Sequence, residues 1–83
     1  MEIKMKTIRF KSIPEYWIKE FNGLKPNTVR VFDDADSRQD VIISWLFQPF
    51  KLEVEIENTA SGDVFTRTVK DITQFNDVYI ISW

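Results

Sequence analysis

The sequence predicts a single small α+β domain over residues 1–83, with one main helix packed at the side of a curled sheet or small open β-barrel of five to six strands. Three observations predict this class. A chain of 83 residues can bury only one hydrophobic core. One segment repeats apolar residues at helical spacing, whereas most of the others alternate or run apolar as strands do. Aromatic residues, at 14% of the chain, supply much of the apolar area that so short a chain must bury.

The composition excludes several classes of chemistry. The chain has no cysteine and no histidine, which excludes disulfides, Cys/His zinc sites, thiol nucleophiles and imidazole acid–base catalysis. No apolar run approaches the ~18 residues of a membrane span, and the first six residues lack the apolar segment of a signal peptide. We therefore expect no cofactor, no membrane partner and a cytoplasmic location.

Charge is distributed unevenly along the chain. The net charge is −2, but residues 1–30 hold seven basic and three acidic side chains, against four and ten in residues 31–83. A localised basic face could meet a phosphate or a nucleotide. The acidic balance of the whole chain argues against tight, sequence-independent binding to long nucleic acid.

The first two elements are predicted from alternation and from helix-start signals. Residues 2–10 alternate imperfectly and predict a strand. Ser12 or Ile13 then lies near a helix cap, and Pro14 suits the first helical position. Gly23, which tolerates positive φ, is predicted to end the helix. The predicted apolar stripe of this helix consists of Ile13, Trp17, Phe21 and Leu24, with Ile18 beside them.

The segment after the helix is the first candidate for a site. Pro26 prevents the helix from continuing, and residues 28–32 predict a strand in which Thr28 and Arg30 share one face. One interpretation is a half-buried strand whose polar face is solvated. The other is that Thr28 and Arg30, with Lys25 on the preceding loop, line the floor and rim of a pocket for a polar ligand.

The middle of the chain predicts a loop followed by a buried strand. Residues 33–40 are acidic and are expected to form a solvated loop. They lack the glycine turn and the terminal glutamate of a calcium loop, so we expect no metal there. Residues 41–47 are almost all apolar, β-branched or aromatic, which is typical of a central strand covered on both faces.

The last third predicts a hairpin and a terminal strand. Residues 51–57 alternate cleanly, residues 58–62 supply turn chemistry, and residues 63–70 return as a strand. On that return strand Arg67 shares a face with apolar neighbours. It either pairs with a glutamate across the hairpin or reaches the pocket as a second cation.

The segment that follows is expected to be a short connection with a helical turn around residues 72–75. The chain ends in an apolar strand, residues 78–83, which has to pair inside a sheet because an exposed edge of that composition would aggregate.

Three short motifs, Ile13-Pro14-Glu15-Tyr16-Trp17, Phe21-Asn22-Gly23-Leu24-Lys25 and Thr28-Val29-Arg30, resemble the start of ASCH domains, the compact branch of the PUA-like superfamily. Residues 57–69 and 79–81 are similar to the hairpin and final strand of small ASCH-like proteins, including phage-associated ones. The resemblance implies a β-barrel with a cleft between helix and sheet. It also implies an association with RNA or modified nucleobases.

One bacterial branch of that family hydrolyses an N4-acylated cytidine, with a lysine and a threonine at the positions that Lys25 and Thr28 resemble. That branch also needs a glutamate before its last strand, where this chain offers only Asp71 or Asp77. Gln39-Asp40 stands where the family usually has a Gly-Asp turn. A hydrolase without its general base loses ~10²–10⁴-fold in rate, so we favour a non-catalytic module.

Three hypotheses therefore stand. The favoured one is a non-catalytic RNA- or nucleotide-binding module with its pocket between the helix and the next strand. Its candidate ligand-binding residues are Lys25, Thr28, Arg30 and Arg67, with Tyr16 or Trp17 as an exposed aromatic that stacks on a base.

The second hypothesis is a minimal amidohydrolase in which Asp71 or Asp77 lies within hydrogen-bond reach of Lys25, with Thr28 as the other catalytic residue. The third is a protein interaction module, for instance a phage-type inhibitor, whose acidic residues 33–40 contact a basic partner. For the oligomeric state we expect a monomer or a weak homodimer.

Overall fold

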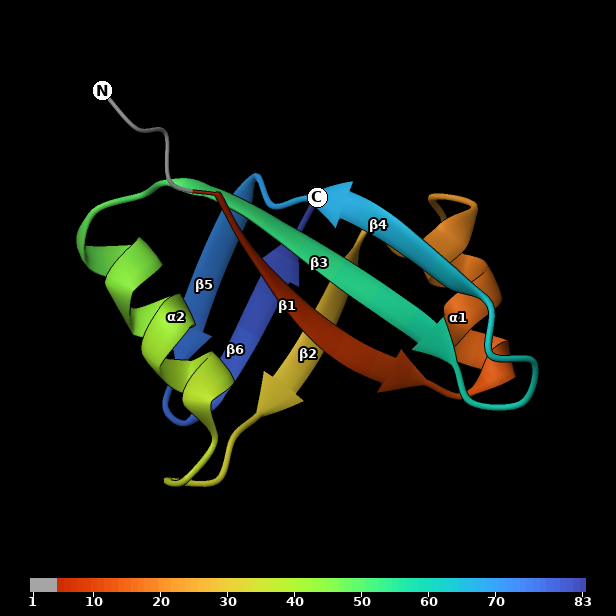
Figure 1. The fold of residues 1–83 in the computed structure, drawn as a ribbon, viewed down its shortest axis with the longest axis horizontal. Helices are drawn as coiled ribbons and strands as arrows, with labels where there is room; N and C mark the ends of the chain where they lie inside the picture. The colour runs from red at the N-terminus through yellow and green to blue at the C-terminus, as the bar shows by residue number, and fades with distance from the viewer. Residues whose placement is uncertain (1–4) are drawn as a thin grey trace.

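The computed structural model describes residues 5–83, which form six strands and two helices. In chain order they are β1 (Met5–Ser12), α1 (Pro14–Phe21), β2 (Asn27–Val31), α2 (Ser37–Phe47), β3 (Lys51–Asn58), β4 (Val64–Thr68), β5 (Asp71–Phe75) and β6 (Val78–Ser82). The strands form two open three-stranded sheets, β1-β3-β4 and β2-β6-β5 (Figure 1). The predicted α+β class is confirmed. The predicted start of the first strand, residues 2–4, lies outside the described residues.

The first sheet follows the predicted alternation. β1 pairs in parallel with β3, so that Ile8 lies opposite Val54 and Phe10 opposite Ile56. β3 then continues through a hairpin into antiparallel β4. Leu52, Val54 and Ile56 have no exposed surface, and Ile8 and Phe10 join them in the core. The hydrophobic effect therefore fixes which face of this sheet turns inward.

The second sheet corrects the prediction for the segment before the last strand. β6 pairs with β2 on one side and β5 on the other, both antiparallel, so the terminal strand pairs inside a sheet of its own chain, as expected. The residues expected to be a connection with a helical turn form strand β5 instead. Asn76 has a φ of 55°, and this left-handed residue makes the tight turn into β6.

The predicted central strand at residues 41–47 is wrong, because these residues lie in helix α2. The Asp36 carboxylate accepts a bond from the Arg38 backbone N–H at 3.0 Å and caps the helix inside the expected loop. Ile42 is fully buried and Trp45, three residues on, packs against the core, while Phe47 is 88% exposed. One-sided burial at helical spacing and the cap outweigh the strand preference of β-branched residues.

Helix α1 begins and ends where the sequence predicts, but it buries an unexpected residue. Ile13 is the N-cap, Pro14 is the first helical residue, and Gly23 has a φ of 84° just past the end. The predicted apolar stripe is buried only in part, since Leu24 is 77% exposed. The buried residue of the helix is Glu20, at 1% exposure.

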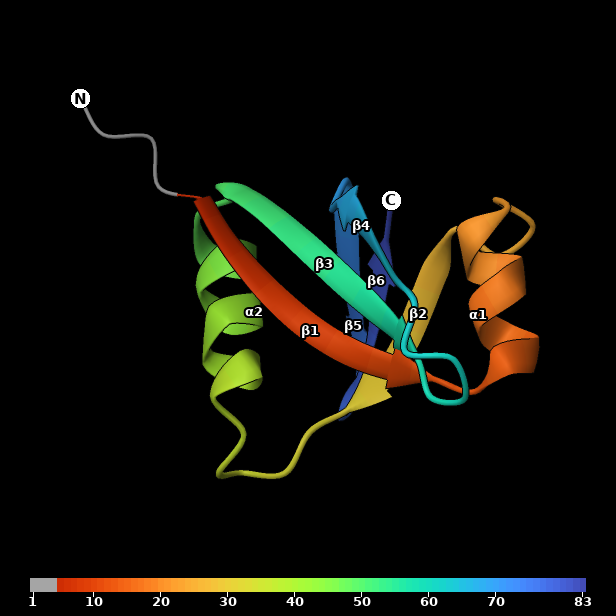
Figure 2. The same ribbon diagram turned by 45° about the vertical axis from the view of Figure 1, so that its right-hand side comes forward.

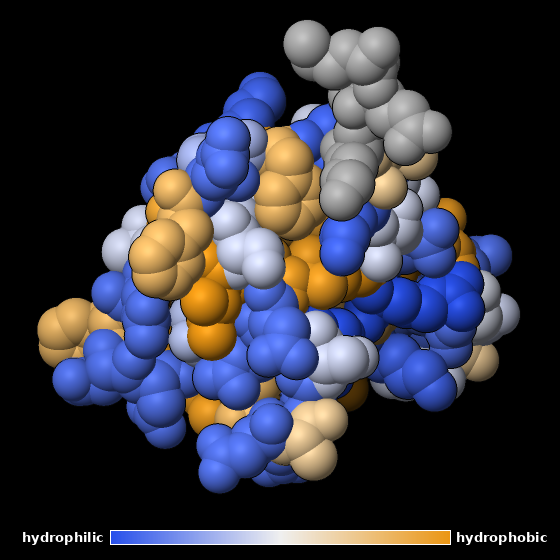
Figure 3. All heavy atoms as spheres, turned by 60° about the vertical axis from the view of Figure 1, so that its left-hand side comes forward, coloured by the Kyte–Doolittle hydropathy of each residue, from blue (hydrophilic) through white to orange (hydrophobic). Residues whose placement is uncertain are grey.

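The two helices lie at opposite ends of the strands, with the core between the sheets (Figures 1 and 2). On the α2 side, patches of apolar side chains are separated by hydrophilic ones (Figure 3). Over residues 5–83, neither helix is long and apolar enough to cross a membrane.

Candidate functional site

A hollow of about 430 Å³ opens between α1 and β2, and we call it the helix hollow. This volume lies within the range of small-molecule sites, ~300–1,000 Å³. It is lined by Lys11, Ser12, Ile13, Tyr16, Glu20, Lys25, Thr28, Val29 and Arg30. The end of β1, the helix, the loop after it and β2 each contribute side chains. The hollow brings together Lys25, Thr28, Arg30 and Tyr16 from the set of candidate residues.

Strand β2 turns its polar face inward, which corrects the interpretation of a solvated polar face. Thr28 is 2% exposed, whereas Val29 is 52% and Val31 62% exposed. The reason is a set of hydrogen bonds that satisfies the buried polar groups. The Arg30 Nε donates to Thr28 Oγ1 at 2.8 Å, and its two terminal nitrogens donate to Lys11 O and Ser12 Oγ, each at 3.1 Å.

The charge of Arg30 is held in a partly apolar setting. Its guanidinium carbon lies 4.6 Å from the centre of the Phe10 ring. Burial lowers the pKa of Arg30 from its ordinary value, the Glu20 carboxylate acts in the opposite direction, and the like charge of Arg38 adds to the lowering. Because the ordinary value is so high, the group stays charged at neutral pH.

Glu20 is the least satisfied polar group of the hollow. Its Oε2 lies 3.5 Å from Lys25 Nζ, while its Oε1 is buried and has no hydrogen-bond partner among the described residues. Lys25 Nζ also donates to Asn27 O at 3.1 Å and lies 5.9 Å from the centre of the Tyr16 ring. A buried acceptor without a donor costs about 1–3 kcal/mol of stability, and no hydrogen bond from residues 5–83 offsets that cost at Oε1.

Trp17 does not face the helix hollow, which corrects the expectation that it is exposed for stacking. Its indole Nε1 donates to Ile56 O at 3.0 Å, and its ring stacks on Phe21 with centroids 5.2 Å apart. Trp17 therefore anchors α1 to β3. Tyr16 is 50% exposed and lines the hollow, so of the two candidate aromatic side chains it is the one that the hollow contains.

Arg67 meets neither of its two expectations. None of the ion pairs among residues 5–83 joins it to a glutamate. It donates instead to Phe21 O at 3.1 Å and packs on Phe65, with its guanidinium carbon 4.8 Å from the ring centre. It lines a separate hollow with Lys70 and Trp83, on the other side of Glu20 from the helix hollow.

The two candidate catalytic aspartates also lie away from the helix hollow. Asp71 begins β5, with β6 between it and β2, and its Oδ2 accepts a bond from Thr73 Oγ1 at 3.3 Å. Asp77 is exposed in the turn before β6. The expectation that one of them reaches Lys25 is therefore not met, because the carboxylate beside Lys25 is that of Glu20.

Sequence reasoning missed Glu20, although a signal for it existed. Glu20 falls three residues after Trp17 and four before Leu24, so it interrupts the predicted apolar stripe. An acid on the buried face of a helix needs a partner, and this need marks a candidate site. No cluster of three or more metal-ligating side chains, counted over residues 5–83, is placed to hold a metal ion.

Comparison of the chain with family models, curated proteins and solved structures finds no match. The site must therefore be interpreted from its own geometry, and the resemblance to ASCH domains stays a prediction.

Proposed function

We propose that this protein is a non-catalytic module that binds one nucleotide, either free or as part of single-stranded RNA, with its base in the helix hollow. The observation that carries the proposal is the buried Glu20 Oε1 without a partner. A carboxylate oxygen accepts N–H groups, and base edges present such groups as amino or ring N–H donors. A base in the hollow would supply the hydrogen bond that Glu20 lacks.

The other groups of the hollow suit the same ligand. The cations of Lys25 and Arg30 lie beside Glu20, so donors for base oxygens and ring nitrogens accompany the acceptor. Tyr16 offers a half-exposed ring on which a base can stack. The uneven charge of the chain fits one nucleotide better than a long stretch of nucleic acid. The cleft that the resemblance to ASCH domains implies lies at the same place, which supports the proposal by analogy.

The burial and the hydrogen bond of Thr28 favour binding over hydrolysis. Its hydroxyl oxygen is buried and accepts the bond from Arg30 Nε, so it serves the network that holds β2. Asp71 and Asp77, the carboxylates proposed for the amidohydrolase, lie outside the hollow.

The test is chemical-shift mapping of labelled protein against nucleosides, nucleoside monophosphates and short single-stranded RNA. We expect the shifts to cluster at Tyr16, Lys25 and Thr28. Glu20→Gln, which removes the charge but keeps the shape, should weaken binding about tenfold, the usual weight of one charge-assisted hydrogen bond. Glu15→Gln, on the exposed face of the same helix, is the matched control and should bind normally. Equal affinities of the two variants, or a spectrum that no ligand moves, would contradict the proposal.

A second candidate function, a protein interaction module, is favoured by a different surface. Val31 and Phe75 lie exposed on the outer face of the second sheet, where they flank Val78 of β6. Exposed apolar residues gathered on one face are typical of a contact surface. Val31→Lys would abolish a protein contact made there and leave nucleotide binding unchanged.

A further inference from the structure

A second hollow adjoins the helix hollow on the far side of Arg30, and we call it the arginine hollow. It measures about 450 Å³ and is lined by Arg9, Phe10, Lys11, Arg30 and Arg38. Two guanidinium groups, those of Arg30 and Arg38, line this hollow in a chain whose net charge is −2. Lys11 and Arg30 line both hollows, so a ligand in one is in reach of the other.

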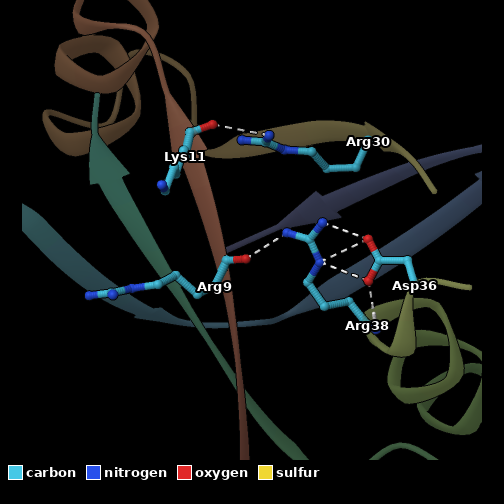
Figure 4. Close-up of polar contacts among 5 residues, drawn as sticks. All are labelled: Arg9, Lys11, Arg30, Asp36 and Arg38. Carbon is cyan, nitrogen blue, oxygen red and sulfur yellow. Dashed lines mark hydrogen bonds and ion pairs between the residues drawn. The ribbon is translucent and has the colours of Figure 1, made fainter. Parts of the chain in front are cut away.

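Two guanidinium groups stand along one edge of β1 (Figure 4). Arg30, from β2, donates to Lys11 O at 3.1 Å, and Arg38, from α2, donates to Arg9 O at 2.7 Å. The accepting carbonyls belong to residues two apart on one strand, which places them about 7 Å from each other. Two charged forks that bond to carbonyls this close together can hold one phosphate group between them.

The two like charges are only partly compensated. Both guanidinium carbons pack on Phe10, at 4.6 and 4.9 Å from its ring centre. Asp36 pairs with Arg38 at 2.6 Å, whereas among residues 5–83 Arg30 forms no ion pair within 4.0 Å and the Glu20 carboxylate acts on it only at longer range. An anion between the two groups would offset their repulsion.

Both guanidinium groups keep donors for such an anion. A guanidinium has five N–H donors, and the bonds among residues 5–83 engage three of them in Arg30 and three in Arg38. Two N–H groups therefore remain on each. The side chain of Arg9 does not compete, because it pairs with Glu55 and Glu57 and leaves β1 on the other side (Figure 4).

We infer that the arginine hollow binds a phosphate group between Arg30 and Arg38, and that this phosphate belongs to the nucleotide whose base occupies the helix hollow. The second half of the inference rests on the proposed function. The first half rests only on the two guanidinium groups. Arg30 would then hold the centre of the ligand, with Glu20 at the base and Arg38 at the phosphate.

The experiment compares a nucleoside, its 5′-monophosphate, a dinucleotide and inorganic phosphate on the intact protein, followed through the Nε–H signals of Arg30 and Arg38. We expect the monophosphate to bind about tenfold tighter than the nucleoside and to move the Arg38 signal, which the nucleoside leaves unchanged. Inorganic phosphate should move the Arg38 signal as well, at higher concentration. If the dinucleotide binds as tightly as the monophosphate, the site takes a phosphate of the RNA backbone. If the dinucleotide binds more weakly, the site takes a terminal phosphate.

The possible failures are distinguishable. Equal affinities for nucleoside and monophosphate, with shifts only at Lys25 and Thr28, would overturn the phosphate site and leave the proposed function intact. A response to inorganic phosphate at Arg38 without any response to the nucleoside or the nucleotides would overturn the link to a nucleotide.

Two variants are expected to change the same affinity ratio in opposite directions, which separates an effect on the site from a damaged fold. Arg38→Gln should lower the ratio of monophosphate to nucleoside affinity about tenfold. Asp36→Asn keeps a good helix cap but removes the competing carboxylate, so the same ratio should rise about threefold. A damaged fold does not bind more tightly. Lys51→Gln, an exposed cation on β3 outside both hollows, is the control and should change nothing. An unchanged ratio in both Arg38→Gln and Asp36→Asn would overturn the site.

Discussion

Strands β2 and β3 have similar alternating sequences, yet they turn opposite kinds of side chain toward the core. β3 buries Leu52, Val54 and Ile56 completely and leaves its charged residues outside. β2 buries Thr28 and turns Val29 and Val31 outward. The first arrangement is what apolar burial alone would select.

The difference shows where the fold gives up stability. On β3 the inward face contributes directly to the core, whereas on β2 the inward face needs Arg30 to satisfy Thr28, Ser12 and a carbonyl of β1. Even then, one oxygen of Glu20 is left without a partner. Polar groups buried at such a cost are typical of functional sites, and the proposed ligand would complete this face of β2.

The largest expected effect tests the β3 side of the comparison. Ile56→Ala removes a fully buried side chain and should lower the free energy of unfolding by about 3 kcal/mol. Chemical denaturation measures it. Val31→Ala on β2, at an exposed position, is the matched control and should stay within about 0.5 kcal/mol. Similar losses in the two variants would remove the contrast between the strands.

The next effect tests the polar network of β2. Arg30→Met keeps the length of the side chain but leaves Thr28 and Ser12 without its donors, and should cost about 2 kcal/mol of stability. Thermal unfolding at neutral pH measures it, with Arg67→Met as a control for a second arginine that packs on aromatic rings. A stable Arg30→Met variant would show that the network does not hold the strand.

A stabilising double substitution sharpens the comparison further. Glu20→Leu together with Lys25→Met replaces the whole ion pair with apolar side chains and should raise the free energy of unfolding by about 1–2 kcal/mol, while it abolishes ligand binding. Denaturation and shift mapping on the same sample give both values. A destabilised variant would mean that the pair of Glu20 and Lys25 supports the fold.

The smallest effect is a dependence on pH. Hydrogen bonds from Arg38 lower the pKa of Asp36 from its ordinary value. The stability that this pair contributes is therefore fully present at pH values above the ordinary pKa of an aspartate, and it is lost as the pH falls through the lowered pKa of Asp36. When Asp36 is protonated, it no longer compensates the charge of Arg38, which acts as a like charge on Arg30 of β2. Acid should therefore loosen β2 before β3. Hydrogen exchange of the two strands across that range, in wild type and in Asp36→Asn, measures it. Equal acid sensitivity of both strands in both proteins would contradict it.

Local patterns explain which parts of the fold could be predicted. The alternation of β3, and the proline that starts α1 with the glycine just past its end, are signals within a few residues, and both elements form as expected. The prediction of a strand at residues 41–47 is wrong because a run of β-branched residues favours a strand, and the acidic residues that include the Asp36 cap favour a loop. The prediction of a helical turn where β5 lies is wrong because the turn after β5 depends on one left-handed residue, Asn76, that gives little signal in the sequence.

Only the part of the site that follows from the alternation of a strand could be predicted from the sequence. Period-two spacing places Thr28 and Arg30 on one face, and Lys25 precedes them closely, so these three could be expected together. Glu20 could have been found as an acid on an apolar stripe. The position of Arg38 follows from α2 meeting the edge of β1, a tertiary contact that no local pattern encodes.

The two arginines have a consequence for the behaviour of the protein in concentrated solution. Over the described residues β1 pairs only with β3, so its other edge presents free carbonyls to any extended chain nearby. Arg30 and Arg38 occupy two of those carbonyls and thereby act as edge protection against aggregation. A substitution at either position therefore exposes part of a sheet edge, in addition to removing donors of the proposed anion site. Protection of the edge and the proposed recognition depend on the same two side chains.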